Sequence, residues 1–264
     1  MDLELNAKHV LITGGSKGIG LACAQTFLRE GAAVTLVARD SARLEAARKD
    51  LLAEFAAGRV GAQAADLRSA DEALRAVDAA QAELGDIDIL VNSAGAARRT
   101  PPDELTPRHW REAMDAKYFT YIHVIDPVVK RMAARGAGVI VNVIGMGGKT
   151  PSGTHLPGGA ANAALMLVTA GMAGAYGRRG VRVNAVNPSL TLTDRLLQGI
   201  DAEARWSGQS AEQVRQRMTA HLPIGRMAKP EEIADMVVFL ASRRASYVSG
   251  AIVSMDGAAV PLVV

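Results

Sequence analysis

The feature that most constrains this chain is a glycine-rich turn between an apolar run and an amphipathic stretch near the N-terminus. The apolar run His9 to Thr13 predicts a buried strand, and the turn after it carries Gly14, Gly18 and Gly20. The following stretch is apolar and ends at a glycine, which is typical of a helix with a C-terminal glycine cap. This order predicts a dinucleotide site, because the glycines let backbone N–H groups approach a pyrophosphate and the helix N-terminus carries partial positive charge.

The second predicted strand, 32–38, carries Arg39 at its tip. Sites that bind NAD usually have an acidic residue at this tip for the ribose 2′-hydroxyl, whereas an arginine accommodates the 2′-phosphate of NADP. Lys17 in the glycine turn adds a second positive charge, and Asp40 follows Arg39 directly. The sequence therefore predicts NADP(H) as the cofactor, with NAD(H) less favoured. The alternative is that Arg39 is a solvated loop residue.

Strand and helix patterns alternate along the rest of the chain. Further strands are expected over 60–65, 87–91, 139–143, 181–186 and 252–255, and helices over 41–57, 69–84, 105–134, 157–176, 194–222 and 230–242. Regular alternation predicts an α/β fold with a Rossmann-type, doubly wound parallel sheet and helices on both faces. The sequence has no linker or repeat, so one domain spanning 1–264 is expected.

Composition narrows the class of function. Of the 264 residues, 49 % are hydrophobic and 22 % charged, which is ordinary for a globular domain. The single cysteine excludes an internal disulfide, and no His/Cys/Asp motif predicts a metal. The net charge of +3 is scattered and aromatic residues make up 4 %, so we expect no nucleic-acid binding. No signal pattern and no apolar run approaching about 18 residues is present, which favours a cytoplasmic protein without a membrane span.

Short motifs spread over nearly the whole chain resemble those of the short-chain dehydrogenase/reductase family. They are 13–20 (TGGSKGIG), 66–67 (DL), 92–95 (NSAG), 180–188 (GVRVNAVNP), 225–227 (GRM), 230–234 (PEEIA) and 256–257 (DG). The resemblance implies that the cofactor contacts Gly14, Ser16, Lys17, Gly18, Ile19, Gly20, Arg39, Asp66, Leu67, Asn92, Ala94, Gly95, Pro188 and Thr193. Within that set it places Arg39 at the 2′-phosphate. It places Pro188 and Thr193 beside the nicotinamide.

The family's catalytic residues do not carry over. Members use a Tyr as general acid, a Lys four residues later that lowers the pKa of the Tyr, a Ser after the fifth strand and an Asn in the preceding helix. Counted from the flanking motifs, these positions hold Gly158, Asn162, Gly145 and Lys117. No Tyr-x-x-x-Lys spacing occurs anywhere in the sequence. A divergent member that lacks the Ser-Tyr-Lys-Asn tetrad is therefore expected.

Two residues are candidates for replacement chemistry. His155 lies three residues before Gly158, near the start of a predicted helix, and a histidine pKa of about 6.5 suits proton transfer near neutrality. The alternative is an exposed loop histidine. Lys117 is expected at the floor of the cleft, where it supplies a cation near Asn162, binds a substrate carboxylate or fills space. Lys149, in a glycine-rich loop, is a weaker candidate for an anion contact.

The region 194–222 takes the position of the family's substrate lid. Its apolar wall would consist of Leu196, Leu197, Ile200, Trp206 and Met218. The helix over 157–176 is rich in Ala and Gly, which lets another helix approach closely. With the apolar tail 260–264, this helix favours a homodimer or homotetramer, as the resemblance implies.

Three functions remain open. The first is an NADP(H)-dependent oxidoreductase that acts on an unknown carbonyl or alcohol, with His155 or Lys117 as a relocated acid. The second is an NADP(H)-binding sensor or a catalytically inactive partner without redox turnover. The third is a lyase or isomerase that uses the same cleft. The intact residues Gly14, Gly18, Gly20 and Asn92 indicate that cofactor binding is still used, and the lost tetrad argues against ordinary dehydrogenase activity.

Overall fold

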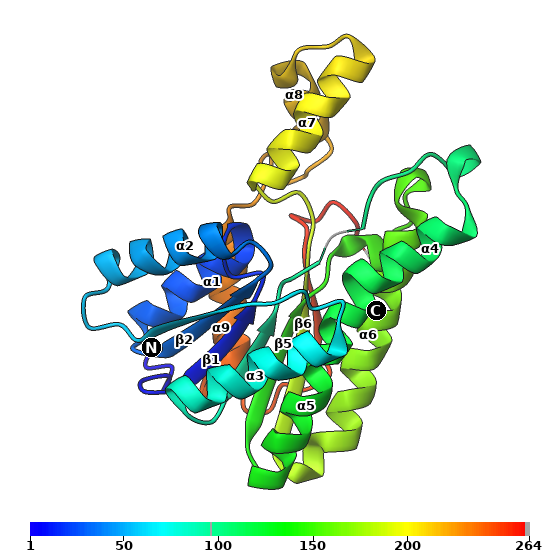
Figure 1. Cartoon of the computed structure of the whole chain (residues 1–264). Helices are drawn as coiled ribbons and strands as arrows, with labels where there is room; N and C mark the ends of the chain where they lie inside the picture. The colour runs from blue at the N-terminus through cyan, green and yellow to red at the C-terminus, as the bar shows by residue number, and fades with distance from the viewer. Residues whose placement is uncertain (96, 262–264) are drawn as a thin grey trace.

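The chain is built on a seven-stranded parallel sheet in the order β3-β2-β1-β4-β5-β6-β7 (Figure 1). The computed structural model describes residues 1–95 and 97–261, and only the backbone of Gln198, Ala202 and Trp206. The strands are β1 (His9–Thr13), β2 (Ala33–Ala38), β3 (Val60–Ala64), β4 (Ile89–Asn92), β5 (Gly138–Val143), β6 (Val181–Pro188) and β7 (Ile252–Met255). The doubly wound α/β sheet predicted from the sequence is confirmed.

Helices cover both faces of the sheet (Figure 1). They are α1 (Gly18–Arg29), α2 (Ser41–Glu54), α3 (Ala70–Leu84), α4 (Pro107–Ala113), α5 (Thr120–Arg135), α6 (Leu156–Tyr176), α7 (Asp194–Ser207), α8 (Ala211–Ala220) and α9 (Pro230–Ala241). Side chains alternate along each strand, so Val10 and Ile12 of β1 pack in the core under α1, α2 and α9. Leu11 packs in the opposite core under α3, α5 and α6. Burial on both faces explains why the strands are almost wholly apolar.

The segment 105–134, expected as one helix, is divided into three parts. A π-helix, Met114–Phe119, joins α4 to α5, and a 3-10 turn, Pro102–Glu104, precedes them. Pro127 lies inside α5 without ending it. Single π-turns of this kind are frequent at functional sites, because they turn side chains away from the regular helical face.

One helical segment, Gly153–Arg179, is long and apolar enough by composition to cross a membrane, although the sequence analysis expected no such run. Its main part is α6, in which Ala161, Leu165 and Thr169 are fully buried against the sheet. Since the core helix of a globular fold passes the same composition test, this segment is explained by its packing.

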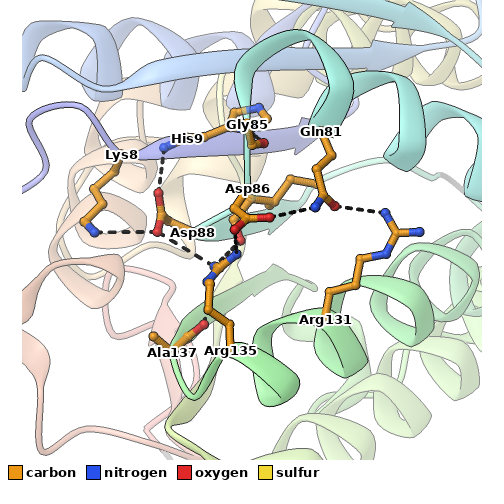
Figure 2. Close-up of polar contacts among 10 residues, drawn as sticks. Lys8, His9, Gln81, Gly85, Asp86, Asp88, Arg131, Arg135 and Ala137 are labelled. Atoms are coloured by element: carbon orange, nitrogen blue, oxygen red, sulfur yellow. Dashed lines mark hydrogen bonds and ion pairs between the residues drawn. The ribbon is translucent and has the colours of Figure 1, made fainter.

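A polar network ties the amino ends of β1 and β4 to the neighbouring helices (Figure 2). The buried ring of His9 contacts the Gly85 carbonyl at 2.8 Å and the Thr35 hydroxyl at 2.9 Å. Asp88 accepts the backbone N–H of His9 at 3.0 Å and lies 3.8 Å from the guanidinium of Arg135. The network lies at the end of the strands opposite to the glycine turn, so it serves the fold and leaves the carboxyl edge free for a site.

Candidate functional site

A cavity of about 970 Å³ lies at the carboxyl ends of β1 to β4. Ligands of open α/β sheets bind in this position, outside the strand ends where the strand order reverses. The predicted cofactor residues that line it are Gly14, Ser16, Lys17, Gly18, Ile19, Arg39, Asp66, Leu67, Ala94, Gly95 and Thr193. Segments far apart in the sequence thus form one cleft.

Three of the predicted cofactor residues, Gly20, Asn92 and Pro188, do not line this cavity. A Cβ on Gly20 would come within 2.3 Å of the Gly14 carbonyl oxygen, so only glycine lets α1 start this close to the turn. Asn92 is fully buried and donates to the Asn142 side chain at 3.0 Å. Pro188 ends β6 in register with β7. Their roles as direct cofactor contacts stay predictions.

The glycine turn fits a pyrophosphate group. Gly14 and Gly18 have φ of +69° and +56°, and a Cβ on Gly14 would fall 2.9 Å from the backbone nitrogen of Ala94. Lys17, the N-cap of α1, makes no side-chain capping bond within the described chain, and the first turn of α1 carries no acid. The N–H groups of this turn are therefore available to an anion, and the helix dipole favours negative charge there.

Five cationic residues line the cavity, namely Lys17, Arg39, Arg43, Arg68 and Arg195, of which Lys17 and Arg39 are predicted cofactor contacts. Arg68 contacts Asp66 through Nε at 3.0 Å and lowers the pKa of that carboxyl. Arg43 lies 4.0 Å from the carboxylate of Asp40. Within the part of the chain that is described, Lys17 and Arg39 have no such ion pair, and they stay the predicted contacts of the 2′-phosphate.

His155 lies at the start of α6 with its ring directly over Gly158. A Cβ on Gly158 would fall 2.2 Å from Cε1 and 2.5 Å from Nε2 of the imidazole. The ring therefore occupies the space that any side chain at position 158 would need. Its Nδ1 is buried without a hydrogen-bond partner among the described residues. Burial, and then the charges of Arg99, Arg195 and Lys117, lower the pKa of His155 below its usual value.

Lys117 lies in the π-helix with only 7 % of its surface exposed. Its Nζ donates to the Tyr121 hydroxyl at 2.8 Å and to the Val143 carbonyl at 3.1 Å. The Tyr121 hydroxyl donates to the same carbonyl, and burial raises the pKa of this tyrosine. Desolvation, with a smaller contribution from the charge of Arg195, lowers the pKa of Lys117 to about 7. This amine can gain or lose a proton near neutral pH.

The other residues predicted near the substrate lie as follows. Lys149 donates to the Ser254 hydroxyl at 3.2 Å, toward β7, and so has a structural partner. The helices α7 and α8 project beyond the carboxyl edge of the sheet (Figure 1). Ile200 is buried in a small core of this projection, with Leu196 and Met218 packed against it, while Leu197 is 47 % exposed. The side chain of Trp206 and the tail residues 262–264 lie outside the described residues.

Comparison with known proteins identifies the family. Residues 14–258 match the family model described as Enoyl-(Acyl carrier protein) reductase. The D-threitol dehydrogenase of Mycolicibacterium smegmatis is 34 % identical over 97 % of this chain and 94 % of its own length. The chain belongs to the short-chain dehydrogenase/reductase family. These matches confirm the prediction of an oxidoreductase.

Solved members of the family agree with this fold over its full length. L-sorbose reductase from Gluconobacter frateurii, complexed with NADPH and L-sorbose, has a TM-score of 0.94 and 31 % identity and covers 100 % of both chains. A short chain oxidoreductase from Pseudomonas aeruginosa, NADPH-bound and described as containing an atypical catalytic center, has a TM-score of 0.89. It is 30 % identical and covers 98 % of this chain and 99 % of its own. NADPH in these relatives supports the predicted cofactor.

Three residues near this site, Tyr121, Arg99 and Arg195, were not predicted from the sequence. Tyr121 is one, although its spacing of four from Lys117 puts both on one helix face. Arg99 and Arg195 carry no local signal, because the loop after β4 and the first turn of α7 are 96 residues apart and approach each other only in the folded protein. A search for Tyr-x-x-x-Lys misses the reversed order, Lys-x-x-x-Tyr, that the structure uses.

Proposed function

We propose that this protein is an NADP(H)-dependent short-chain dehydrogenase/reductase that interconverts a carbonyl and an alcohol, with His155 as the proton-transfer residue. The observation that carries the proposal is the position of the imidazole, which fills the space above Gly158. Position 158 is where the count from the flanking motifs puts the family's tyrosine. A titratable group thus lies where the family's proton donor would project.

Each residue then has a chemical task. NADP(H), when bound, supplies or accepts the hydride at the reacting carbon. In reduction, the protonated ring of His155 gives its proton to the carbonyl oxygen, and in oxidation the neutral ring takes the proton from the hydroxyl. Lys117 is a positioning residue, because its amine is held against Tyr121 and the Val143 carbonyl. Its charge lowers the pKa of His155 and so tunes the proton transfer.

The cofactor residues are assigned in the same way. Gly14, Ser16 and the N-terminal turn of α1 hold the pyrophosphate, and Lys17 and Arg39 hold the 2′-phosphate. Asp66 and Leu67 flank the adenine. The ribose lies beside Asn92, Ala94 and Gly95, and the nicotinamide beside Pro188 and Thr193. The cavity and the glycine geometry support this assignment.

The proposal extends to organisation. Residues 1–264 form one domain in which 194–222 act as a lid over the substrate. The protein works in the cytoplasm on a small molecule, as a homodimer or homotetramer. The projection of α7 and α8 beyond the sheet supports the lid (Figure 1).

A sensor or catalytically inactive partner that binds NADP(H) without turnover is the second candidate. It is favoured by burial, which lowers the pKa of both His155 and Lys117 and so disfavours the protonated form that a proton donor needs. The NADPH-bound Pseudomonas aeruginosa relative, described as having an atypical catalytic center, favours the enzyme instead.

The test measures NADPH oxidation against a panel of aldehydes and ketones, with binding of NADPH and NADH measured by calorimetry. We expect turnover with at least one substrate class. In His155→Ala the rate should fall about 10²- to 10⁴-fold, the usual contribution of general acid catalysis, with NADPH affinity unchanged. His109→Gln is the matched control, because glutamine keeps the capping partner of Thr106 on α4. Tight NADPH binding with a silent panel would establish the sensor.

A further inference from the structure

We propose that the substrate carries a carboxylate, which Arg99 and Arg195 bind beside His155. The inference rests on the proposed function, because it names the substrate class of the same site. Both guanidinium groups lie close enough to His155 for their charges to lower its pKa, and neither forms an ion pair with a described acid.

Arg99 and Arg195 come from opposite sides of the cleft. Arg99, in the loop after β4, donates from Nη1 to the Thr154 hydroxyl at 3.3 Å, next to His155 in the chain. Arg195, in the first turn of α7, donates from Nη2 to the Ala97 carbonyl at 3.2 Å. The lid helix is thereby tied to the loop that carries Arg99. Although much of its side chain is exposed, burial of the Arg195 guanidinium and the charge of Arg99 lower its pKa.

Among the described residues, no carboxylate pairs with Arg99 or Arg195. Neither forms an ion pair with a described carboxylate, and the acids beside them in the chain, Asp103, Glu104 and Asp194, are exposed. By contrast, Arg217 on the same lid lies 2.7 Å from Glu203. Each charge that affects the pKa of His155 is positive. Cations that converge on a partly desolvated site without a counter-ion favour an anionic ligand.

The position of the cluster separates this anion from the phosphates of the cofactor. Arg195 borders the cofactor cavity, whereas Arg99, Thr154 and His155 do not line it. The shared target of the two guanidinium groups therefore lies toward the substrate side. A planar carboxylate matches a guanidinium fork, which binds it through paired hydrogen bonds.

Binding of a carboxylate has a chemical consequence. Negative charge there opposes the positive charges that lower the pKa of His155, so the pKa of the ring rises when the substrate is bound. The proton needed for reduction is thus taken up with the substrate, and a neutral ketone would not induce this change.

The experiment uses the NADP⁺-loaded protein and three pairs of probes, namely pyruvate, levulinate and benzoylformate with their methyl esters. Affinity is measured by calorimetry, and the pKa of His155 by NMR of the histidine rings. We expect at least one acid to bind about tenfold or more tightly than its ester, the effect of one charge-assisted hydrogen bond, and to raise the pKa of His155. Arg99→Met and Arg195→Met should each remove the preference for the acid, whereas Arg98→Met, beside Arg99 and also exposed, should keep it.

The outcomes separate this inference from the proposed function. Preference for the acid without any NADPH oxidation would uphold the carboxylate site and contradict the enzyme. Turnover of neutral ketones only, with no acid preferred in any pair, would uphold the enzyme and overturn the carboxylate site. A weaker affinity for NADPH in both arginine variants, with the acid preference intact, would assign the arginines to the cofactor and overturn the inference.

Discussion

Adding one methyl group at position 158 tests the location of the His155 ring. A Cβ on Gly158 would fall 2.2 and 2.5 Å from two ring atoms and 2.8 Å from the Cβ of Ala97. Gly158→Ala therefore forces the imidazole out of its place, so we expect it to reduce turnover as strongly as His155→Ala does. The variant should still bind NADPH, because the cofactor cavity is lined by other segments.

The expected loss of folding free energy in Gly158→Ala follows from this steric crowding. Overpacking of this kind costs about 1–3 kcal/mol, and the better helix propensity of alanine returns up to about 1 kcal/mol. In the His155→Ala background the two closest contacts are gone, and only the contact with Ala97 at 2.8 Å remains. Gly158→Ala should then cost about 1–2 kcal/mol less than it does in the wild-type protein.

Urea unfolding of the wild type, the two single variants and the double variant at pH 8 measures this coupling. The lowered pKa keeps His155 neutral at that pH, so the cycle reports packing and not charge. If the two free-energy changes add to within about 0.5 kcal/mol, as independent sites do, the ring does not lie over Gly158 and the reasoning is refuted.

Three further predictions follow from the described contacts. Arg39→Ala should weaken NADPH binding about tenfold or more by calorimetry and leave NADH binding unchanged; equal losses for both would place Arg39 away from the 2′-phosphate. Gly20→Ala should lose nucleotide binding and lower the Tm, because its Cβ would press on the Gly14 carbonyl at 2.3 Å, and a variant that binds normally would contradict the close approach. Lys117→Met should be more stable than the wild type at pH 7, with a difference that shrinks as the pH rises to 9.5. The reason is that the pKa of Lys117 is about 7 in the folded protein and about 10.4 in the unfolded chain, so between these pH values the folded state binds fewer protons than the unfolded state. The stability of the wild type therefore rises with pH in that window. A stability difference that does not change with pH would show that Lys117 has an ordinary pKa.

The sequence predicted the sheet because its signals are local. Each buried strand is a short apolar run, and the glycine turn at Gly14 fixes where the first helix begins. The π-helix was not predictable in this way, and neither were the hydrogen bonds of its Lys117 to Tyr121 and the Val143 carbonyl. The short apolar strands and helical periods carry no sign of such a tertiary contact.

The site also contains residues that local sequence signals predict and residues that only the tertiary structure brings together. The predicted cofactor residues follow strand ends in a fixed order, and most of them line one cavity, while their contacts with the cofactor stay predictions. His155 and Gly158 are neighbours in the chain, and their spacing raised the possibility of replacement, but the ring position depends on the backbone before α6. Arg99 in the loop after β4 and Arg195 in the first turn of α7 are far apart in the sequence, and no local pattern predicts that they lie near each other.

Chemical rescue of His155→Ala tests the central claim most directly. Removal of the ring leaves a space next to Gly158, which has no side chain of its own to fill it. With NADPH and an accepted substrate saturating, we predict that added imidazole restores turnover in His155→Ala, with a pH dependence that follows the imidazole, and leaves His109→Gln unchanged. Full activity of His155→Ala without imidazole would show that His155 does not transfer the proton.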